Sequence, residues 1–281
     1  MSTSYSGDSI TFPDASTQAS AQVGMKNRVI DGGFILNQRV YVSGTSLASG
    51  VYGHDRWKGG ASGGTYTFTQ GALGVNTTIT ITAGSLIHVI EGCNVAEGGT
   101  YVLSWAGTAQ GRLNGGSYGT SGTVTVTGWT AGTNLNVEFN TGTCGSVQLE
   151  KGSTATSFDY RPYGTELALC QRYYAKLGAN PQGSSTYQAY GAGGNTNVNT
   201  AQNIHLSYPQ FMRASPTVAF SGNIGVTVNA TYLNVSLAAA YGGVSSSLVQ
   251  TLSAAIGSAG QGAVLISNGD ATAFISLTAE L

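Results

Sequence analysis

The sequence predicts an all-β protein, and three observations support this fold class. Charged residues make up 8% of the 281 residues, against about 25% in a typical soluble protein. Their place is taken by 42 Gly, by many Thr, Ser and Asn, and by 15 Tyr. Gly and Asn favour tight turns, whereas Thr, Tyr, Val and Ile favour strands. Finally, short segments that alternate between apolar and polar residues follow one another along the chain.

The low charge also excludes classes of protein. The formal net charge is −1, whereas a nucleic-acid binder needs a basic surface to displace counterions from phosphates. The mean hydropathy is +0.03, and no apolar run reaches the roughly 18–20 residues that a membrane-spanning helix needs. We therefore expect neither nucleic-acid binding nor membrane insertion. With 41% hydrophobic residues, the chain has enough apolar surface to fold.

Residues 1–27 form a polar lead-in to the first expected domain. They hold one short expected strand, at residues 10–12, followed by a turn at Pro13 and Asp14. At the start of the chain, no basic stretch is followed by an apolar one, so we expect no signal peptide. We therefore expect synthesis in a reducing cytoplasm.

Residues 28–163 are expected to fold as a sandwich or jelly roll. An apolar stretch at residues 28–40 comes first. Then follow segments with a two-residue period, separated by Gly, Asn or Ser, at residues 65–69, 77–82, 85–90, 100–105, 123–129, 134–139 and 146–150. A series of short strands at close spacing is typical of sandwiches and jelly rolls.

The alternation predicts which side chains share a strand face. Tyr101 shares one face of its strand with Leu103 and Trp105. In the next expected strand, Val124 and Val126 lie on the opposite face from Trp129.

Residues 164–177 contain the one expected helix. Thr165 can cap its N-terminus, Glu166 lies in the first turn, Lys176 lies in the last turn, and Gly178 follows the end. This helix would link two β domains.

Residues 178–281 are expected to form a second, distal β-sandwich. The expected strands are residues 202–207, 216–221, 224–229, 232–237, 263–267 and 272–281. The segment carries three charged residues, Arg213, Asp270 and Glu280, fewer than the surface of a monomeric domain usually has. Burial against identical copies is one explanation, and a surface rich in Thr, Ser, Asn and Gly is the other. We expect a homo-oligomer.

The three cysteines show no metal-binding pattern. Cys93, Cys144 and Cys170 lack C-x-x-C spacing and are not clustered with histidine. Free cysteines are often buried, so three buried thiols are expected, with a Cys93–Cys144 disulfide as the alternative. We expect no metal and no cofactor.

No constellation of catalytic groups stands out. His88 shares a strand face with Leu86 and Ile90, as a core histidine would. Glu91 and Glu97 flank a loop, but nothing places them around a cleft as a pair of glycosidase carboxylates. The G-x-S-x-G, P-loop, H-E-x-x-H and EF-hand patterns are absent from the sequence. We expect that the protein is not an enzyme.

The tripeptide Asp55-Arg56-Trp57 is a candidate structural motif. In an extended strand, Asp55 and Trp57 would share a face and Arg56 would point the other way. We expect Arg56 to pair with a carboxylate and Trp57 to fill the core of the sandwich. Glu150 and Arg161 are further candidates for partly buried structural charges.

The candidate ligand contacts are tyrosines in two segments that are expected to be exposed. Tyrosine supplies a flat ring that can stack on a sugar, together with a hydroxyl group. These candidates are Tyr187 and Tyr190 in residues 183–195, and Tyr232 and Tyr241 in residues 229–241.

Two alternatives stay open for this region. The tyrosine rings could instead pack in the core or between subunits, and residues 242–262 could form a flexible distal loop. His205 alternates with Ile204 and Leu206, so it is expected on the polar face and joins the candidate ligand contacts.

An ordered series of short motifs runs along the chain. Residues 10–18 read ITFPDASTQ, residues 27–39 read NRVIDGGFILNQR, and residues 52–57 read YGHDRW. Residues 147–162 read VQLEKGSTATSFDYRP and residues 166–174 read ELALCQRYY. Near the end, residues 212–218 read MRASPTV and residues 278–281 read TAEL. In their order, these motifs resemble bacteriophage tail-fibre and receptor-binding proteins that carry a jelly-roll module similar to carbohydrate-binding modules.

The resemblance implies a homotrimeric, non-enzymatic tail-fibre subunit of the virion, synthesised in the host cytoplasm. Residues 1–27 would attach to other tail or baseplate proteins, and residues 28–163 would form the jelly roll. The helix would lead to a tip, residues 178–281, that binds a host-surface receptor, expected to be a glycan, during adsorption. The alternatives are a fibre or decoration protein of the capsid or tail with a purely structural role and, less favoured, a polysaccharide depolymerase.

Overall fold

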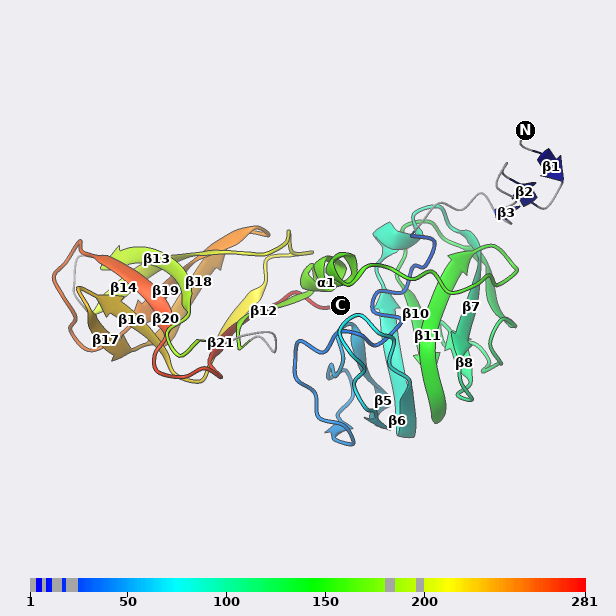
Figure 1. The fold of residues 1–281 in the computed structure, drawn as a ribbon, viewed down its shortest axis with the longest axis horizontal. Coiled ribbons are helices and arrows are strands. Elements are labelled where there is room, and N and C mark those ends of the chain that lie inside the picture. The colour runs from blue at the N-terminus through cyan, green and yellow to red at the C-terminus, as the bar shows by residue number, and fades with distance from the viewer. Residues whose placement is uncertain (1–3, 7–8, 12–16, 19–24, 180–184, 196–199) are drawn as a thin grey trace.

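The protein is nearly all-β, with 47% of its residues in strands and 5% in helices (Figure 1). The computed structural model describes residues 4–6, 9–11, 17–18, 25–179, 185–195 and 200–281. Residues 25–162 build one set of strands, called here the first β unit, and residues 172–281 build another, called the second β unit. The two units lie side by side along the long axis of the molecule, with the helix α1 (Tyr163–Gln171) between them.

The N-terminal residues form a small antiparallel sheet of three strands in the order β1-β2-β3. Its strands are β1 (Ser4–Ser6), β2 (Ser9–Thr11) and β3 (Thr17–Gln18). Strand β2 includes Ile10 and Thr11 of the expected strand. Phe12 and the expected turn at Pro13 and Asp14 lie outside the described residues.

The first β unit is built on an eight-stranded sheet in which β4-β5-β6-β11-β7-β9 follow one another. Strand β10 pairs with one half of β6 and with β8, whereas β11 pairs with the other half of β6. One long strand therefore contributes to two layers, and the sheet curls over a single core. The strands are β4 (Ser46–Leu47), β5 (Trp57–Thr67), β6 (Ile79–Ile90), β7 (Gly99–Ala106), β8 (Gly111–Leu113), β9 (Val124–Trp129), β10 (Leu135–Phe139) and β11 (Gly142–Lys151).

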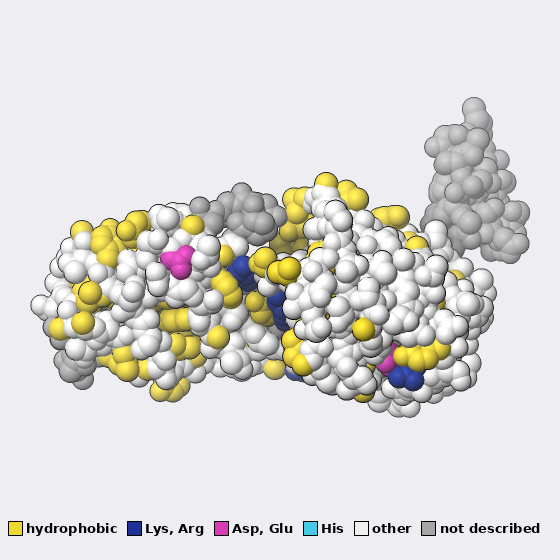
Figure 2. Space-filling view, turned by 90° about the horizontal axis from the view of Figure 1, so that it is seen from below, with side chains coloured by type: hydrophobic (Ala, Val, Ile, Leu, Met, Phe, Trp, Pro, Cys, Tyr) yellow, Lys and Arg dark blue, Asp and Glu magenta, His cyan; other side chains and the backbone are white. Residues whose placement is uncertain are grey.

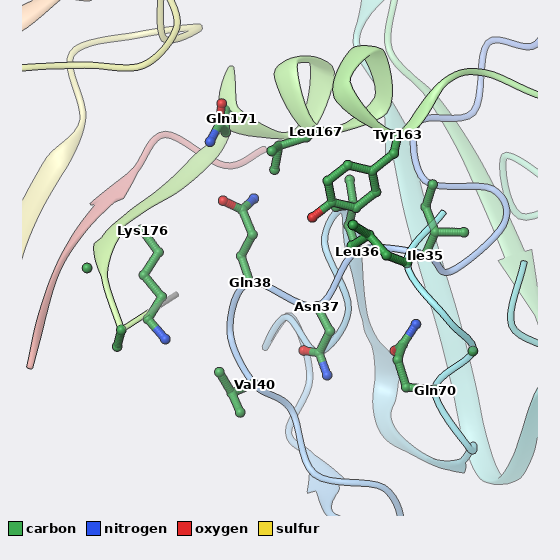
Figure 3. A pocket seen from close by; sticks show the side chains of 14 residues that line it. Ile35, Leu36, Asn37, Gln38, Val40, Gln70, Tyr163, Leu167, Gln171 and Lys176 are labelled. Carbon is green, nitrogen blue, oxygen red and sulfur yellow. The ribbon is translucent and has the colours of Figure 1, made fainter. Parts of the chain in front are cut away.

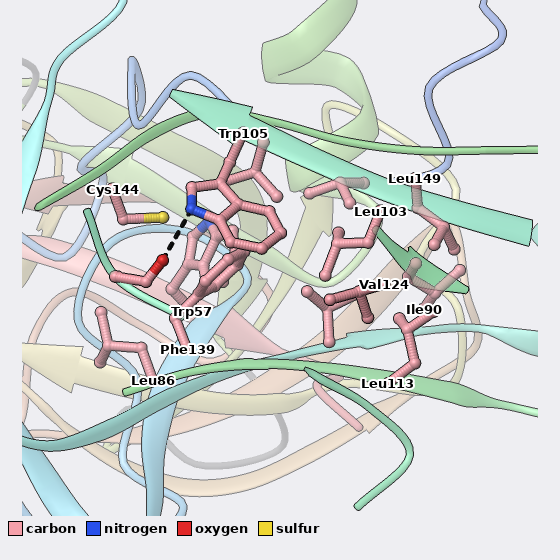
Figure 4. Close-up of a cluster of buried hydrophobic side chains, with 14 of the residues drawn as sticks. Trp57, Leu86, Ile90, Leu103, Trp105, Leu113, Val124, Phe139, Cys144 and Leu149 are labelled. Carbon is pink, nitrogen blue, oxygen red and sulfur yellow. Dashed lines mark hydrogen bonds between the residues drawn. The ribbon is translucent and has the colours of Figure 1, made fainter. Parts of the chain in front are cut away.

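Aromatic side chains fill the centre of this core (Figure 4). The ring of Trp57 is completely buried and stacks on Phe34 with 4.7 Å between centroids. Trp105 packs edge-on against Phe139 at 4.9 Å, and its Nε1 donates a hydrogen bond to the Ala109 carbonyl oxygen at 2.9 Å. Each buried indole nitrogen needs a hydrogen-bond acceptor. Trp57 Nε1 has one in the Asp31 carbonyl oxygen, at 3.0 Å.

The expected strands at residues 77–82 and 85–90 are one continuous strand, β6, so the predicted break between them is wrong. Gly84 lies inside this strand with a positive φ of 66°, and a Cβ there would meet the Gly63 carbonyl oxygen at 2.2 Å. The glycine therefore permits close approach of β5 and β6 instead of ending a strand.

The expected face of Trp129 is also wrong. Strand β9 carries one extra residue opposite β7, because Gly99 pairs with Trp129 and Tyr101 pairs with Val126. Gly128, with a φ of 62°, lies in this bulge. A bulge reverses the alternation, and Trp129 consequently packs against the same core as Val126.

The helix is shorter than expected. Residues 164–177 were predicted to be helical, but α1 ends at Gln171 and residues 174–178 form β12 (Tyr174–Gly178). The expected N-cap, Thr165, lies within the first turn, and Pro162 occupies the N-cap position. Strand β12 forms because it can pair along its whole length with β21 (Phe274–Thr278), and such distant pairing overrides local helix propensity. Among the described residues, no helix is long and apolar enough to cross a membrane.

The second β unit consists of two antiparallel sheets. The smaller has the order β12-β21-β15, and the larger has the order β17-β16-β20-β13-β14-β19-β18. The remaining strands are β13 (Ala189–Asn195), β14 (Ala201–Ser207), β15 (Thr217–Ser221), β16 (Ile224–Val228), β17 (Thr231–Asn234), β18 (Ser236–Gly242), β19 (Ser246–Leu252) and β20 (Gly262–Ser267). Apolar side chains of both sheets, such as Leu277 and Leu265, share one buried cluster.

Two strands of the larger sheet were not predicted. Residues 189–195 were expected in an exposed segment, and residues 246–252 fell in a stretch for which a flexible loop was left open as an alternative, whereas they form β13 and β19. The glycine-rich sequence of β13 is typical of a loop, but its glycines allow the strands to approach closely. A Cβ on Gly193 would meet the Asn203 carbonyl oxygen at 1.8 Å. The expected strand at residues 232–237 is divided between β17 and β18.

A buried histidine in the first β unit makes stability depend on pH. His54 is completely buried, with Nδ1 2.9 Å from the Tyr66 hydroxyl and Nε2 3.1 Å from Gln70 Oε1. Burial lowers the pKa of His54 from 6.5 to about 4. Between these two pH values the unfolded chain binds more protons than the folded protein, so stability is lost as the pH falls through this window.

We expect this histidine to contribute about 3 kcal/mol to the pH dependence of unfolding between pH 7 and pH 4. The measurement is urea unfolding of the protein and of His54→Gln at a series of pH values. Burial raises the pKa values of Asp31 and Asp55, and these carboxyls oppose the slope in both proteins. The comparison therefore isolates His54, and parallel stability curves for the two proteins would contradict the prediction.

Candidate functional site

The larger sheet of the second β unit presents one face to the buried cluster and the other outward. Directly opposed residues of neighbouring strands lie on the same face, so the strand register identifies a line of side chains that crosses all seven strands. This line, called here the outer row, consists of Tyr241, Leu248, His205, Ala192, Val264, Thr227 and Tyr232. At about 4.8 Å between strands, it spans roughly 29 Å.

The outer row is accessible and has an aromatic ring at each end. Tyr241 is 63% exposed, Tyr232 is 49% exposed and Leu248 is 41% exposed. His205 is exposed, and the residues in the middle of the row are small or half-buried. The row therefore forms an accessible strip of aliphatic side chains, His205 and Thr227 between two tyrosines. Figure 2 shows hydrophobic side chains spread over the second β unit, among few charged ones.

Tyr187 extends one end of the row. Its ring lies against Tyr232 with 5.3 Å between centroids, and it is 55% exposed. The backbone around it is fixed to β20, because Gln188 N donates to Ser267 Oγ at 2.7 Å and Gly269 N donates to the Thr186 carbonyl at 2.8 Å. Two exposed rings on a fixed backbone would lose little conformational entropy on contact with a ligand.

No strand of the larger sheet contains Lys, Arg, Asp or Glu. The three charged residues in 178–281 lie outside these strands and have partners. Arg213 donates to the Ala279 and Glu280 carbonyls at 3.0 and 3.1 Å. Asp270 accepts from Asn223 N at 3.0 Å, and the Glu280 carboxylate pairs with arginines of the first β unit. A ligand on the outer row would therefore meet aromatic, aliphatic and polar side chains, without Lys, Arg, Asp or Glu.

Of the five expected ligand contacts, Tyr190 is placed wrongly. It lies in β13 and not in a loop, and its hydroxyl donates to the Ala273 carbonyl at 2.7 Å. The register of β13 against β20 shifts between Ala189 and Gly191, so Tyr190 sits in a bulge and packs against the buried cluster. Burial raises the pKa of its hydroxyl.

Leu248 is the large exposed residue of the outer row that was not among the expected ligand contacts. It lies between Tyr241 and His205, and its strand alternates Leu248, Gln250 and Leu252 on the outward face. That alternation was available in the sequence but lay in the stretch interpreted as a possible loop.

Asp55 and Arg56 precede β5 in a tight turn, so the expected two-residue alternation does not apply to them. Arg56 has a positive φ of 67° and is 1% exposed. Its guanidinium pairs with Glu280, donates to the Val89 carbonyl at 2.6 Å and lies 3.6 Å from the centre of the Tyr173 ring. Arg56 thereby connects the two β units.

Asp55 belongs to the same contact region, called here the junction cluster: Arg39, Asp55, Arg56, Tyr173 and Glu280. Its carboxylate accepts hydrogen bonds from Gln38 N at 2.7 Å and Gln38 Nε2 at 2.8 Å. Arg39 donates to Glu280 at 2.9 Å. Burial lowers the pKa of Arg56, but the neighbouring Glu280 carboxylate and other groups raise it on balance, so the guanidinium stays charged.

Glu150 and Arg161 fix the segment between β11 and α1. Glu150 accepts from Gln148 Nε2 at 2.8 Å and from Thr156 N at 2.7 Å. Arg161 donates to both carboxylate oxygens of Glu166 at 3.0 Å. Both charges therefore hold chain segments together and lie apart from the outer row.

The groups considered for catalysis are engaged separately. Glu91 accepts from the Tyr173 hydroxyl at 2.8 Å, whereas Glu97 pairs with Arg28. His88 is buried, with Nε2 2.9 Å from the Ile30 carbonyl oxygen. Within the described part of the chain, no group of three or more His, Cys, Asp or Glu side chains could hold a metal ion.

The cysteines differ from both expectations. All three are free, so Cys93 and Cys144 form no disulfide, and Cys93 is exposed whereas Cys144 and Cys170 are buried. Burial raises the pKa values of the Cys144 and Cys170 thiols, which keeps them protonated.

Comparison with known proteins gives no independent assignment: no protein-family model matches the sequence, and no curated protein matches it.

Proposed function

We propose that the protein is a non-enzymatic tail-fibre subunit of a bacteriophage virion that binds a host-surface glycan during adsorption. The observation that carries this proposal is the outer row, an accessible sheet face without Lys, Arg, Asp or Glu and with exposed tyrosines at both ends. The motif series at residues 27–57 and 147–174, which resembles tail-fibre proteins, supports the phage assignment.

The chemistry of this face suits a neutral polyhydroxylated ligand. Tyr187 and Tyr232 offer aromatic faces for sugar rings, and the Tyr241 ring offers another about 29 Å away along the row. Asn203 and Gln250 oppose each other on the same face, each two residues along its strand from His205 or Leu248. Their amides can donate and accept hydrogen bonds from sugar hydroxyls.

In this proposal the chain acts as a homotrimer. The jelly-roll domain, residues 28–163, forms the stalk, the second β unit forms the tip, and residues 1–27 attach to other tail or baseplate proteins. The scarcity of charge in residues 178–281 supports burial against identical copies. Three copies can raise a weak single-site affinity by about 10²–10⁴ where the geometry permits simultaneous binding.

The assembly has its own test. We expect light scattering to give the mass of a trimer at micromolar concentration, because obligate interfaces exceed roughly 2,000 Å². A monomer mass under these conditions would contradict the trimer.

We expect Tyr187→Ala combined with Tyr232→Ala to reduce adsorption to host cells at least about tenfold, because each lost ring removes about 1 kcal/mol or more of contact energy. The measurement is binding of the purified protein to host cells, with light scattering to check the assembly. Tyr160→Ala is the matched control: Tyr160 is 72% exposed and also contacts an aromatic ring, that of Phe158, but it lies in the first β unit.

Salt separates this site from a charged one. Because the strands of the larger sheet carry no charged residue, adsorption should change little between about 50 and 300 mM salt. Unchanged adsorption of the double variant would remove the outer row as the receptor site and favour a purely structural virion role. Release of sugar from purified capsule or lipopolysaccharide would instead favour a depolymerase.

A further inference from the structure

A cavity of about 360 Å³ lies where the first β unit meets α1 and β12 (Figure 3). Gln38 and Val40 reach it from the first β unit, and Gln171 and Lys176 reach it from α1 and β12. Its volume falls within the range of small-molecule sites, about 300–1,000 Å³, and such sites are common between packed units.

The cavity has apolar walls and an apolar rim. Ile35 and Leu167 line it, and Val40 and Leu73 at the rim are 59% and 62% exposed. Val40 also has a positive φ of 55°, which is unfavourable for a β-branched residue. Two exposed aliphatic side chains and a strained backbone therefore mark the entrance.

Several polar groups that line the cavity are already engaged. Gln70 contacts His54 and donates to the Phe34 carbonyl at 3.2 Å. Asn37 uses its amide to bridge the backbone of Tyr41 at 2.7 and 2.9 Å. These groups shape the cavity, and their hydrogen bonds leave little capacity for a ligand.

Four other polar groups are available to a ligand. Gln38 uses its Nε2 for Asp55 and the Tyr174 carbonyl, so its Oε1 remains as an acceptor. The Tyr163 hydroxyl, the Gln171 amide and Lys176 Nζ make no hydrogen bond to any described residue, although Lys176 lies 4.5 Å from the centre of the Phe274 ring. In Figure 3, Tyr163 and Gln38 point toward the space that α1 and β12 enclose.

Lys176 is the one charged residue among the side chains that line the cavity. The Asp55 and Glu280 carboxylates of the junction cluster are engaged by Gln38, Arg39 and Arg56 and do not line the cavity. The cavity thus presents one cation, neutral donors and acceptors, and apolar walls.

We propose that this cavity binds a sugar acid, a small ring that carries several hydroxyl groups and one carboxylate. The carboxylate pairs with Lys176, the hydroxyls bond to Gln38 Oε1, the Gln171 amide and the Tyr163 hydroxyl, and the apolar face of the ring lies on Leu167. Charge-assisted hydrogen bonds are the strong ones in such a site. The ligand contacts both β units and is independent of the outer row.

The test is a ligand-detected NMR titration of the full-length protein with sodium glucuronate and, separately, with glucose. We expect saturable binding of glucuronate in the millimolar range or tighter, and binding of glucose weaker by about tenfold or more, because glucose lacks the carboxylate. Failure of glucuronate to saturate, or equal affinity for the two sugars, would overturn the proposal. Methyl glucuronide mimics a glucuronate residue that is linked into a glycan. If it binds as glucuronate does, the cavity accepts a glycan-linked residue. If only glucuronate binds, the ligand is the free sugar acid.

Variants locate the site. Lys176→Gln should weaken glucuronate binding about tenfold or more, while Lys151→Gln, a lysine in β11 outside the cavity, should leave it unchanged. Leu73→Trp serves as a second variant because Leu73 is exposed at the rim and its replacement can fill the entrance without changing the core. Unaltered glucuronate binding by either cavity variant would refute the assignment. Binding here should weaken with added salt, unlike the adsorption expected of the outer row.

Discussion

Trp57→Ala is expected to lower the free energy of unfolding by about 3–5 kcal/mol, the range for large buried aromatic residues. Trp57 is completely buried, stacks on Phe34, packs at 5.1 Å against His88 and donates a hydrogen bond to the Asp31 carbonyl. Truncation leaves a cavity in the centre of the first β unit and an unpaired buried carbonyl, and both are destabilising. Urea unfolding at pH 7 measures the change.

Trp129→Ala is the matched control for this experiment. Trp129 lies at the end of β9 and is only partly buried, so its truncation should cost clearly less than that of Trp57. An equally stable Trp57→Ala protein that had lost ligand binding would contradict a core role for this residue and assign it to a binding site.

The alternation of apolar and polar residues was sufficient to predict which side chains share a strand face where the strands are regular. Tyr101, Leu103 and Trp105 were expected to share a face, and all three are buried in one cluster. The same reasoning failed at Trp129, because β9 carries a bulge that adds one residue and reverses the faces beyond it. A bulge depends on the partner strand, and local sequence does not contain the register of that partner.

Glycine was ambiguous for a related reason. In β6 and β13, glycine permits close strand approach, yet the same residue type normally indicates a turn. The end of α1 shows the influence of a distant partner in another way, because β12 is fixed by pairing with β21, about a hundred residues later in the chain.

The candidate sites depend even more strongly on distant pairing. Two segments of the sequence were expected to expose tyrosines, and Tyr187, Tyr232 and Tyr241 are exposed. The row that places Tyr232 and Tyr241 on one sheet face, however, follows from the register of all seven strands, including two strands that were not predicted. Arg56 was expected to pair with a carboxylate, but only the folded chain identifies Glu280 as that carboxylate.

Arg56→Met is expected to destabilise the protein by about 3–5 kcal/mol, as breaking a buried ion pair does. The Arg56 and Glu280 side chains are 1% and 7% exposed, so removal of the guanidinium leaves the Glu280 carboxylate with Arg39 alone in a desolvated site. The variant also loses the bond to the Val89 carbonyl and the contact with the Tyr173 ring. Urea unfolding gives the change, with Arg28→Met as the matched control.

The control and a double variant show how the junction cluster contributes to the free energy of unfolding. Arg28 pairs with Glu97 at the surface, with side chains 27% and 44% exposed, so its replacement should cost less than about 1 kcal/mol. In Arg56→Met combined with Glu280→Leu, no unpaired carboxylate remains, and the cost should fall below the sum of the two single changes. Arg39, whose side chain is 15% exposed, can turn toward water when Glu280 is lost. Strict additivity of the two changes would show that Arg56 and Glu280 do not interact, and the polar connection between the two β units would then rest on other pairs such as Arg39 with Glu280.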